Sequence, residues 1–497
     1  MPSTAITPVT APERIQTIDI IRGLALFGIL LVNFTVDNGN VSPMEGRTGI
    51  ADQLVYWPVY FFMNDKFLAI FAFLFGLGFA IQLRRRESAG SPIILFYLSR
   101  MLVLAVIGTV VAILISARSI LFDYALLGLL LLLVHKLSRP LIIILAVLCI
   151  LVPWIKNTID ARNKELKAKA ASTNAIIVDT AVLNRYAGQY VHHGDRKMLI
   201  TTEGSKLWMT GRSGKKIELI PQSKNAFILK ANADQFTFGN DSINIINENE
   251  TFTATRIKLE KKTGNKPSKI TGNHYWQKVA NAAEKFWFKI THLSWRFFFF
   301  GTFLYAFPLF LLGLYTGKTK KFNVLTHPLS LCNVCRWGLL LGMLGMGLSV
   351  GFDAWNYVHH IKSESYNILI QNLIVLSWNI GVILTALAYI AGLALLLQKA
   401  KWQQKLSFLI PVGRMGLTNY IMSLIVVDRI FFNTLDDPEY FGPFWRTIFA
   451  LIAFTIFVFI SRWWFQYFRF GPVEWLWRSL SYWKIQPMKL RGEEERK

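Results

Sequence analysis

Ionisable side chains within long apolar runs are the residues of this sequence that could do chemistry. Asp19 and Arg22 are three residues apart near the start of the first run, so a helix would place them on one face. Lys66 lies about eleven residues into the second run, roughly 16 Å deep at the helical rise of about 1.5 Å per residue. Because a charge within a membrane is costly, each of these residues is a candidate for function.

A further candidate set lies near the start of a later run, in the string PVGRMGLTNYIMS. There Arg414 and Thr418 are one helical turn apart and Asn419 follows, which predicts a polar stripe. Two interpretations stay open for the earlier charges. Arg22 is either an anion site oriented by Asp19 or half of a structural salt bridge that reaches the headgroups. Lys66 either belongs to an internal polar cavity or forms a buried structural pair.

Membrane-spanning helices are the elements that must position these side chains. The chain has 497 residues, of which 53% are hydrophobic and 17% charged, whereas a soluble protein averages about 25% charged. A span needs about 20 apolar residues. This length predicts spans near 18–35, 55–82, 95–117, 119–135, 140–155, 295–316, 336–356, 369–398, 406–432 and 444–468. The predicted fold is an all-α integral membrane bundle of about ten transmembrane helices.

The predicted bundle is interrupted once, by a small antiparallel β-barrel domain. From Leu183 onward, short alternating runs are punctuated by Gly, Asn and Asp every eight to ten residues or so, which is typical of a small barrel or sandwich. The predicted domains are a membrane half at 1–155, a stalk at 156–182, the β domain at 183–262, a linker at 263–293, a second membrane half at 294–470 and an amphipathic tail at 471–497.

The short loops predict the orientation. Lys and Arg cluster at 84–86, 135–139, 318–321, 399–405 and 484–491, whereas the alternate loops contain few. An even number of spans places every cluster on one side, and the positive-inside rule makes that side the cytoplasm. We therefore expect a multi-pass membrane protein with both termini cytoplasmic and the β domain extracytoplasmic.

The same rule accounts for the net charge of +24, from 54 Lys and Arg against 30 Asp and Glu. No nucleic-acid partner is needed to explain it, and the lipid bilayer is the expected partner. Cys332 and Cys335 form a lone pair without a second pair to complete a zinc site, so no metal is predicted. Metalloprotease, P-loop, nucleophile-elbow and dinucleotide-binding motifs are absent from the sequence.

Several strings together resemble the YeiB-like bacterial membrane proteins. They are IDIIRGLALFGILLVNF, KFLAIFAFLFGLGFAIQL, PVGRMGLTNYIM and FRFGPVEWLWRSLSY, at 18–34, 66–83, 411–422 and 468–482. That family looks related to the transmembrane acyltransferases, with which it shares the Asp-x-x-Arg-Gly start of the first helix, here Asp19, Arg22 and Gly23. The β domain resembles the lipocalin-like barrel appended to some serine hydrolases.

The resemblance implies a place in a bacterial inner membrane. It also implies acyl transfer from cytoplasmic acyl-CoA, the expected donor, to an extracytoplasmic envelope glycan or small-molecule acceptor. Cations for the CoA phosphates would come from Arg22, Lys66 and Arg414, and hydrogen-bond donors from Asn33 or Asn419. Where the family carries a histidine, this chain has Val111. The candidates for the missing base are Asp123, His359 and His360.

Two rival functions remain open. The same intramembrane charges would serve a transporter or export factor for a small polar or lipid-linked substrate. The missing histidine would also fit a catalytically inactive sensor with a ligand-binding β domain. The sequence does not specify the acceptor or the oligomeric state.

Overall fold

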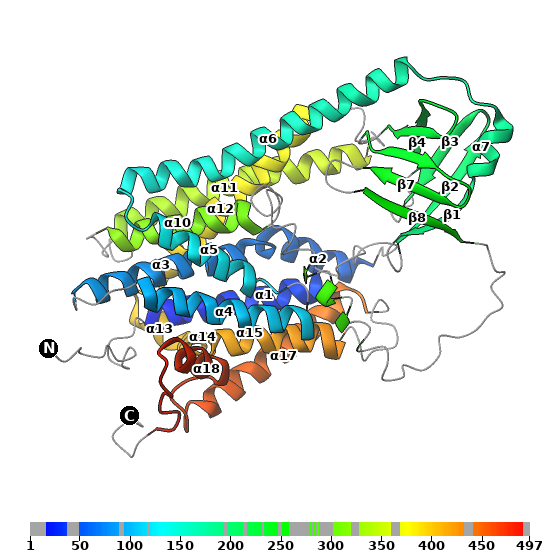
Figure 1. The fold of residues 1–497 in the computed structure, drawn as a ribbon. Coiled ribbons are helices and arrows are strands. Elements are labelled where there is room, and N and C mark those ends of the chain that lie inside the picture. The colour runs from blue at the N-terminus through cyan, green and yellow to red at the C-terminus, as the bar shows by residue number, and fades with distance from the viewer. Residues whose placement is uncertain are drawn as a thin grey trace. The chain divides into compact units, whose positions relative to one another are not determined.

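The computed structural model describes most of the chain. The described ranges are 16–36, 49–88, 94–116, 119–192, 196–211, 216–230, 233–246, 251–257, 302–319, 328–358, 368–431 and 441–490, with a few residues between 276 and 287. These residues form two compact units (Figure 1). The first unit comprises 1–153, 272–354 and 374–497, and the second comprises 154–271 and 355–373.

The first unit is a helical bundle. Its helices are α1 (Gln16–Thr35), α2 (Ile50–Met63), α3 (Lys66–Ser88), α4 (Ile94–Leu114), α5 (Leu121–Val134), α10 (Thr302–Lys318), α13 (Ala400–Lys405), α14 (Leu409–Arg414), α15 (Gly416–Leu424), the π-helical segment η4 (Ile425–Phe431), α17 (Pro443–Trp464) and α18 (Pro472–Ser481). Three longer helices, α6 (Arg139–Thr173), α11 (Pro328–Val358) and α12 (Ile368–Leu396), contribute residues to both units.

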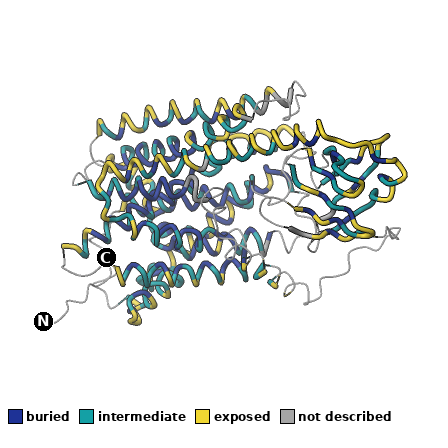
Figure 2. Tube along the Cα trace, turned by 45° about the horizontal axis from the view of Figure 1, so that its top comes forward, coloured by how far each residue is buried: buried dark blue, intermediate teal, exposed yellow. Residues whose placement is uncertain are grey.

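Seven helices within the described ranges are long and apolar enough to cross a membrane, and two shorter apolar helices cover Leu121–Val134 and Gly416–Asp428. The protein is therefore a multi-pass helical membrane protein, as the sequence predicts, although the described spans do not number ten. In the apolar window of α1 61% of the residues are buried, against 18% in that of α6 (Figure 2). Between 141 and 152 the exposed residues of α6 are all apolar, as the hydrocarbon of a bilayer requires.

One predicted span differs from the structure in a way that affects the site. The run at 55–82 is not continuous, because α2 ends at Met63 and α3 begins at Lys66. Asp65 between them has a φ of 65°, which no helical residue adopts. Lys66 is consequently the first residue of α3, directly after a break within the candidate span Ile50–Ser88.

Glycines allow the central helices to approach closely. A Cβ atom on Gly76 of α3 would lie 2.0 Å from the Phe310 carbonyl oxygen of α10, and one on Gly313 would lie 2.2 Å from the Phe73 oxygen. Helix α1 meets α14 in the same way, since a Cβ on Gly413 would lie 1.9 Å from the Asp19 oxygen. Small residues of this kind let membrane helices pack backbone to backbone, which holds α1, α3 and α14 in fixed positions around the site.

The second unit contains the β domain, a closed eight-stranded barrel in which each strand pairs antiparallel with the next. Its strands are β1 (Gly188–His192), β2 (Arg196–Glu203), β3 (Lys206–Thr210), β4 (Lys216–Pro221), β5 (Ala226–Leu229), β6 (Gln235–Phe238), β7 (Ser242–Ile246) and β8 (Thr251–Ile257). The barrel closes because β8 also pairs with β1. Side chains such as Tyr190, Phe227 and Phe238 form its own core, and Leu183 of the short helix α7 (Thr180–Tyr186) packs against them. The predicted β-barrel insert is thus confirmed.

Candidate functional site

A cavity of about 320 Å³ lies within the helical bundle of the first unit. Its walls come from α1, α3, α4, α5, α14, α15 and α18, so it brings together segments from both ends of the sequence. This volume lies in the range of small-molecule sites. The lining includes residues from all four strings quoted from the sequence, at 18–34, 66–83, 411–422 and 468–482.

Arginines dominate the charged lining of this cavity. They are Arg22, Arg85, Arg86, Arg100, Arg414 and Arg478. Glu474 is the single carboxylate among the lining residues that the structure describes. A guanidinium offers planar paired donors that match phosphate and carboxylate groups. The lining therefore favours an anionic ligand.

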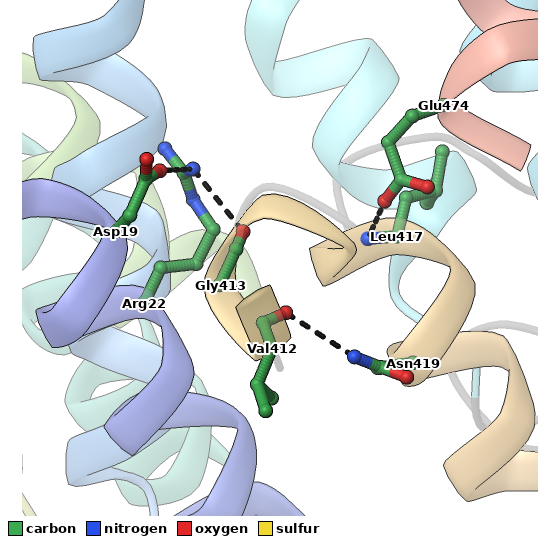
Figure 3. Close-up of polar contacts among 7 residues, drawn as sticks. All are labelled: Asp19, Arg22, Val412, Gly413, Leu417, Asn419 and Glu474. Atoms are coloured by element: carbon green, nitrogen blue, oxygen red, sulfur yellow. Dashed lines mark hydrogen bonds and ion pairs between the residues drawn. The ribbon is translucent and has the colours of Figure 1, made fainter. Parts of the chain in front are cut away.

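Asp19 and Arg22 form the predicted ion pair on one face of α1. The Arg22 Nη1 atom lies 2.9 Å from the Asp19 carboxylate and also donates to the Gly413 carbonyl at 3.4 Å (Figure 3). Asp19 is nearly buried, whereas the Arg22 side chain keeps 31% of its surface exposed and lines the cavity. The pair thus ties α1 to α14 while one face of the guanidinium remains available to a ligand.

Glu474 of α18 fixes the start of α15. Its carboxylate accepts a hydrogen bond from the Leu417 backbone N–H at 2.5 Å (Figure 3). It also accepts hydrogen bonds from the Thr418 N–H at 3.1 Å and the Thr418 hydroxyl at 2.6 Å. These N–H groups belong to the first turn of α15, where no residue of the helix itself can accept them. Burial raises the pKa of Glu474 above its ordinary value, although these hydrogen bonds oppose the shift. The sequence predicts only an amphipathic tail for this stretch, and the structure assigns Glu474 a capping role.

Arg100 of α4 lies between aromatic rings at the α18 side of the cavity. Its guanidinium carbon is 4.2 Å from the Trp477 ring centroid and 5.7 Å from that of Phe96. The Trp477 indole donates to the Arg100 carbonyl at 2.8 Å, which holds α18 against α4. The Arg100 Nε atom is buried and has no hydrogen-bond partner among the described residues. An unsatisfied charged donor on a cavity wall is costly unless a ligand accepts its hydrogen bond.

Arg414 also lines the cavity, as its position in the predicted polar stripe suggested. Its guanidinium carbon lies 4.0 Å from the Phe465 ring centroid, and its Nη2 donates to the Arg469 carbonyl at 3.4 Å. Asn419, from the same stripe, is buried outside the cavity lining. Its amide donates to the Val412 carbonyl at 3.2 Å (Figure 3). It also donates to the Ser461 hydroxyl at 3.0 Å. The Asn419 amide therefore joins α15 to α14 and α17.

Lys66 does not belong to the cavity lining. Its ammonium is fully buried, lies 4.4 Å from the Trp378 ring centroid, and has no hydrogen-bond partner among the described residues. Asn33 is half-buried on α1, about 16 Å along the axis from Arg22 at a rise of about 1.5 Å per residue. The structure thus brings Arg22 and Arg414 together but separates them from Lys66 and Asn33.

The base candidates differ in what the structure describes. His359 and His360 lie outside the described residues. Asp123 is 6% exposed in the first turn of α5, next to the lining residues Leu121 and Tyr124. Sequence reasoning missed Arg100 and Tyr420, which both line the cavity. Arg100 could have been predicted, because it is an arginine within an apolar run.

The fold and the cavity define a multi-pass helical membrane protein with one inserted β-barrel and an arginine-lined cavity. Comparisons confirm the resemblance to the YeiB-like membrane proteins. Residues 322–484 match a family described as "Protein of unknown function (DUF418)". Residues 14–181 match the model "Heparan-alpha-glucosaminide N-acetyltransferase, catalytic". The resemblance to a family related to membrane acyltransferases is therefore supported from both halves of the chain.

Individual relatives extend this similarity. The chain is 25% identical to the uncharacterized protein YxaH of Bacillus subtilis, over 97% of this chain and 98% of the relative. It is 31% identical to an uncharacterized 39.9 kDa protein of Bacillus acidopullulyticus, over 38% of this chain and 55% of the relative. Identity to the uncharacterized protein YeiB of Escherichia coli is 37%, over 14% of this chain and 18% of the relative. No solved structure matches the chain.

Proposed function

We propose that this protein is a transmembrane acyltransferase that moves an acyl group, in the simplest case acetyl, from acyl-CoA to a sugar-containing acceptor of the cell envelope. The match to the catalytic part of an N-acetyltransferase supports this reaction. That match includes α1, α3 and α4, which form three walls of the cavity. A glucosaminide acceptor in the matched family favours a glycan or glycoconjugate as the acceptor here.

The buried Arg100 Nε atom, which has no hydrogen-bond partner among the described residues, within an arginine-lined cavity is the observation that carries the proposal. CoA has three phosphate groups, and a guanidinium–phosphate hydrogen bond is among the stronger ones that proteins make. Arg86 and Arg100 come from neighbouring helices and both lie against the Phe96 ring, at 3.6 Å and 5.7 Å from its centroid. This cluster is where the donor phosphates would bind.

The rest of the lining suits the remainder of the donor. Away from the arginines, the walls are apolar or aromatic, with Phe71, Leu74 and Phe75 from α3 and Leu104 from α4. A cavity of about 320 Å³ has room for a slender acyl arm, with the nucleotide at the arginine end. Residues of this chain would therefore bind the phosphates, enclose the thioester and exclude water from it.

The sidedness of the reaction follows from the basic clusters. Acyl-CoA is cytoplasmic, and the positive-inside rule assigns the basic loops, and with them Arg85 and Arg86, to the cytoplasmic face of an inner membrane. The acceptor would then be modified on the other side, where the β-barrel would also lie.

A binding experiment tests this function. Purified protein in lipid nanodiscs is titrated with acetyl-CoA by calorimetry, for the wild type and for Arg100→Gln. We expect the substitution to weaken binding by about 1.5–3 kcal/mol, which is the scale of a hydrogen bond to a charged group. Arg336→Gln is the matched control, because Arg336 is an exposed arginine of α11 outside the cavity. Lys66→Met should also keep the wild-type affinity.

The contrary results separate the alternatives. Absence of acetyl-CoA binding to the wild type would overturn the acyltransferase proposal. If Arg100→Gln and Arg336→Gln weaken acetyl-CoA binding equally, the cavity is not the acetyl-CoA site. A small anion or lipid phosphate that binds in an Arg100-dependent way, without competition from acetyl-CoA, would instead indicate transport.

A further inference from the structure

The cavity has two chemically different ends along α3. Lining residues on this helix run from Phe71 to Arg86, a length of about 22 Å at 1.5 Å per residue. Arg85 and Arg86 mark one end. The other end, at the level of Phe71, is closed by the start of α5 and by Tyr420 of α15. If the donor phosphates bind at the arginines, as the proposed function requires, its thioester extends toward Tyr420.

Two tyrosines, Tyr124 and Tyr420, line the end away from Arg85 and Arg86, and their hydroxyl groups make different hydrogen bonds. The Tyr124 hydroxyl donates to the Leu68 carbonyl at 3.0 Å, so its proton is engaged by the backbone. The Tyr420 oxygen instead accepts a hydrogen bond from the Ile120 backbone N–H at 3.2 Å. That bond fixes the oxygen without using its proton. The Tyr420 hydroxyl also interacts with the Ser119 side chain.

The backbone around Tyr420 is held firmly. Tyr420 is 4% exposed, and its helix α15 is fixed at its start by Glu474. The chain then passes into the π-helical segment η4, and such segments are frequent at functional sites. A hydrogen-bond donor on a rigid element in a water-poor cavity is the arrangement that stabilises developing charge.

We propose that the Tyr420 hydroxyl is a catalytic residue that donates a hydrogen bond to the thioester carbonyl oxygen. The acceptor's hydroxyl or amine forms a bond to the carbonyl carbon, and the carbonyl π electrons move to the oxygen, where Tyr420 stabilises the negative charge. The C–S bond then breaks, and the thiolate takes up the proton that the acceptor loses. The products are the acylated acceptor and free CoA thiol. This assignment rests on the proposed function and adds the group that activates the donor.

Infrared spectroscopy of a bound donor tests the assignment without knowledge of the acceptor. Acetyl-CoA labelled with ¹³C at the thioester carbonyl is added to the wild type and to Tyr420→Phe in nanodiscs. A hydrogen bond weakens the carbonyl bond, so we expect a lower stretching frequency in the wild type than in Tyr420→Phe. Tyr124→Phe is the matched control and should keep the wild-type frequency, because its hydroxyl donates to Leu68.

Turnover provides a second readout. Membrane vesicles that contain the protein and its native acceptor are supplied with labelled acetyl-CoA, and label in the membrane fraction is counted. Tyr420→Phe should lower kcat by roughly 100-fold, the effect of removing one such donor, with the KM for acetyl-CoA nearly unchanged. Bound acetyl-CoA with equal carbonyl frequencies in the wild type and Tyr420→Phe would overturn the assignment and leave the proposed function intact. A frequency change of the same size in Tyr124→Phe would overturn it as well. Absence of binding would overturn the proposed function itself.

Discussion

Glu474 shows how one side chain can connect two distant strings of the sequence. The strings around 411–422 and 468–482 were recognisable separately, but nothing in their order predicts that a carboxylate of the second caps a helix of the first. The three hydrogen bonds from Leu417 and Thr418 make that connection. The cap also places Glu474 in the cavity lining beside the arginines.

The raised pKa of Glu474 predicts a pH dependence of stability. Burial holds the folded-state pKa above the ordinary value of 4.5, so the folded protein binds this proton more tightly than the unfolded chain does. The contribution of protonated Glu474 to stability is therefore fully present below pH 4.5. It is lost as the pH rises through the folded-state pKa. Glutamine cannot ionise, so the stability of Glu474→Gln lacks this pH dependence. The thermal midpoint of the wild type should therefore fall relative to that of Glu474→Gln as the pH increases across this range.

The cap itself has a separate effect. Glu474→Ala should lower the free energy of unfolding at every pH by roughly 0.5–2 kcal/mol, as is typical of a lost helix cap. The thermal midpoint should fall accordingly. Scanning calorimetry of detergent-purified protein measures both variants. Melting curves of the wild type and Glu474→Gln that stay parallel over the whole pH range would contradict the assigned pKa direction.

Individual residues also show what sequence reasoning could reach. Arg22 and Arg414 were predicted to share a site, and the structure brings both to the cavity. The sequence predicts Lys66 for the same site when the run at 55–82 is interpreted as one unbroken helix. The turn at Asn64 and Asp65 cannot be read from a hydropathy scan, since a two-residue break barely changes the mean hydropathy of a long window.

At the scale of elements, the contact between α3 and α10 holds the long wall of the cavity in place. Gly76 faces the α10 backbone, whereas a Cβ on Gly78 would meet nothing within 4 Å. Gly76→Ala should therefore force the helices apart and destabilise the protein by about 1–3 kcal/mol. Gly78→Ala, two residues away, should be neutral or stabilising by up to about 1 kcal/mol, because alanine favours the helix.

Thermal unfolding of the two alanine variants in the same detergent checks this difference. Similar midpoints for both variants would show that the close approach of α3 and α10 does not limit stability. The general rule that small residues mark helix contacts predicts packing for the whole string FAFLFGLGF. Only the structure distinguishes Gly76, which faces α10, from Gly78, which faces the cavity.

At the scale of the whole molecule, hydrogen bonds gather several basic clusters at one end of the bundle. Arg84 donates to the Gly317 carbonyl at 3.5 Å, and Arg139 donates to the Lys318 carbonyl at 3.2 Å. Near the C-terminus, Ser99 donates to the Ser481 carbonyl at 2.9 Å, which brings α18 to the start of α4. The alternation of basic loops in the sequence predicts such clustering, so the general architecture follows from the sequence.

This clustering predicts the topology. A reporter active only in the cytoplasm should be active when fused at Gly317 or at the C-terminus, and inactive at Asn240 in the barrel, because the positive-inside rule retains the basic end. A reporter active only outside should give the reverse pattern. Cytoplasmic activity at Asn240 would refute the assigned orientation, and with it the route of the acyl group from one face to the other.

The location and the lining of the cavity could not be predicted from the sequence. It is formed by pieces of seven helices that come from both ends of the chain, and the sequence does not show that its deciding residues, Arg100 and Tyr420, meet there. Residue types and spacing predict helices and their charged faces, because those depend on local periodicity. Which faces meet depends on close packing between helices, and that packing depends on side-chain shape more than on pattern.

A structure of the protein in nanodiscs with saturating acetyl-CoA, determined by electron cryomicroscopy, tests the central claim most directly. We predict ligand density in the arginine-lined cavity, with phosphate groups within hydrogen-bonding distance of Arg86 and Arg100 and the thioester end near Tyr420. An empty cavity at saturating ligand, or acetyl-CoA bound elsewhere on the protein, would contradict the proposed function.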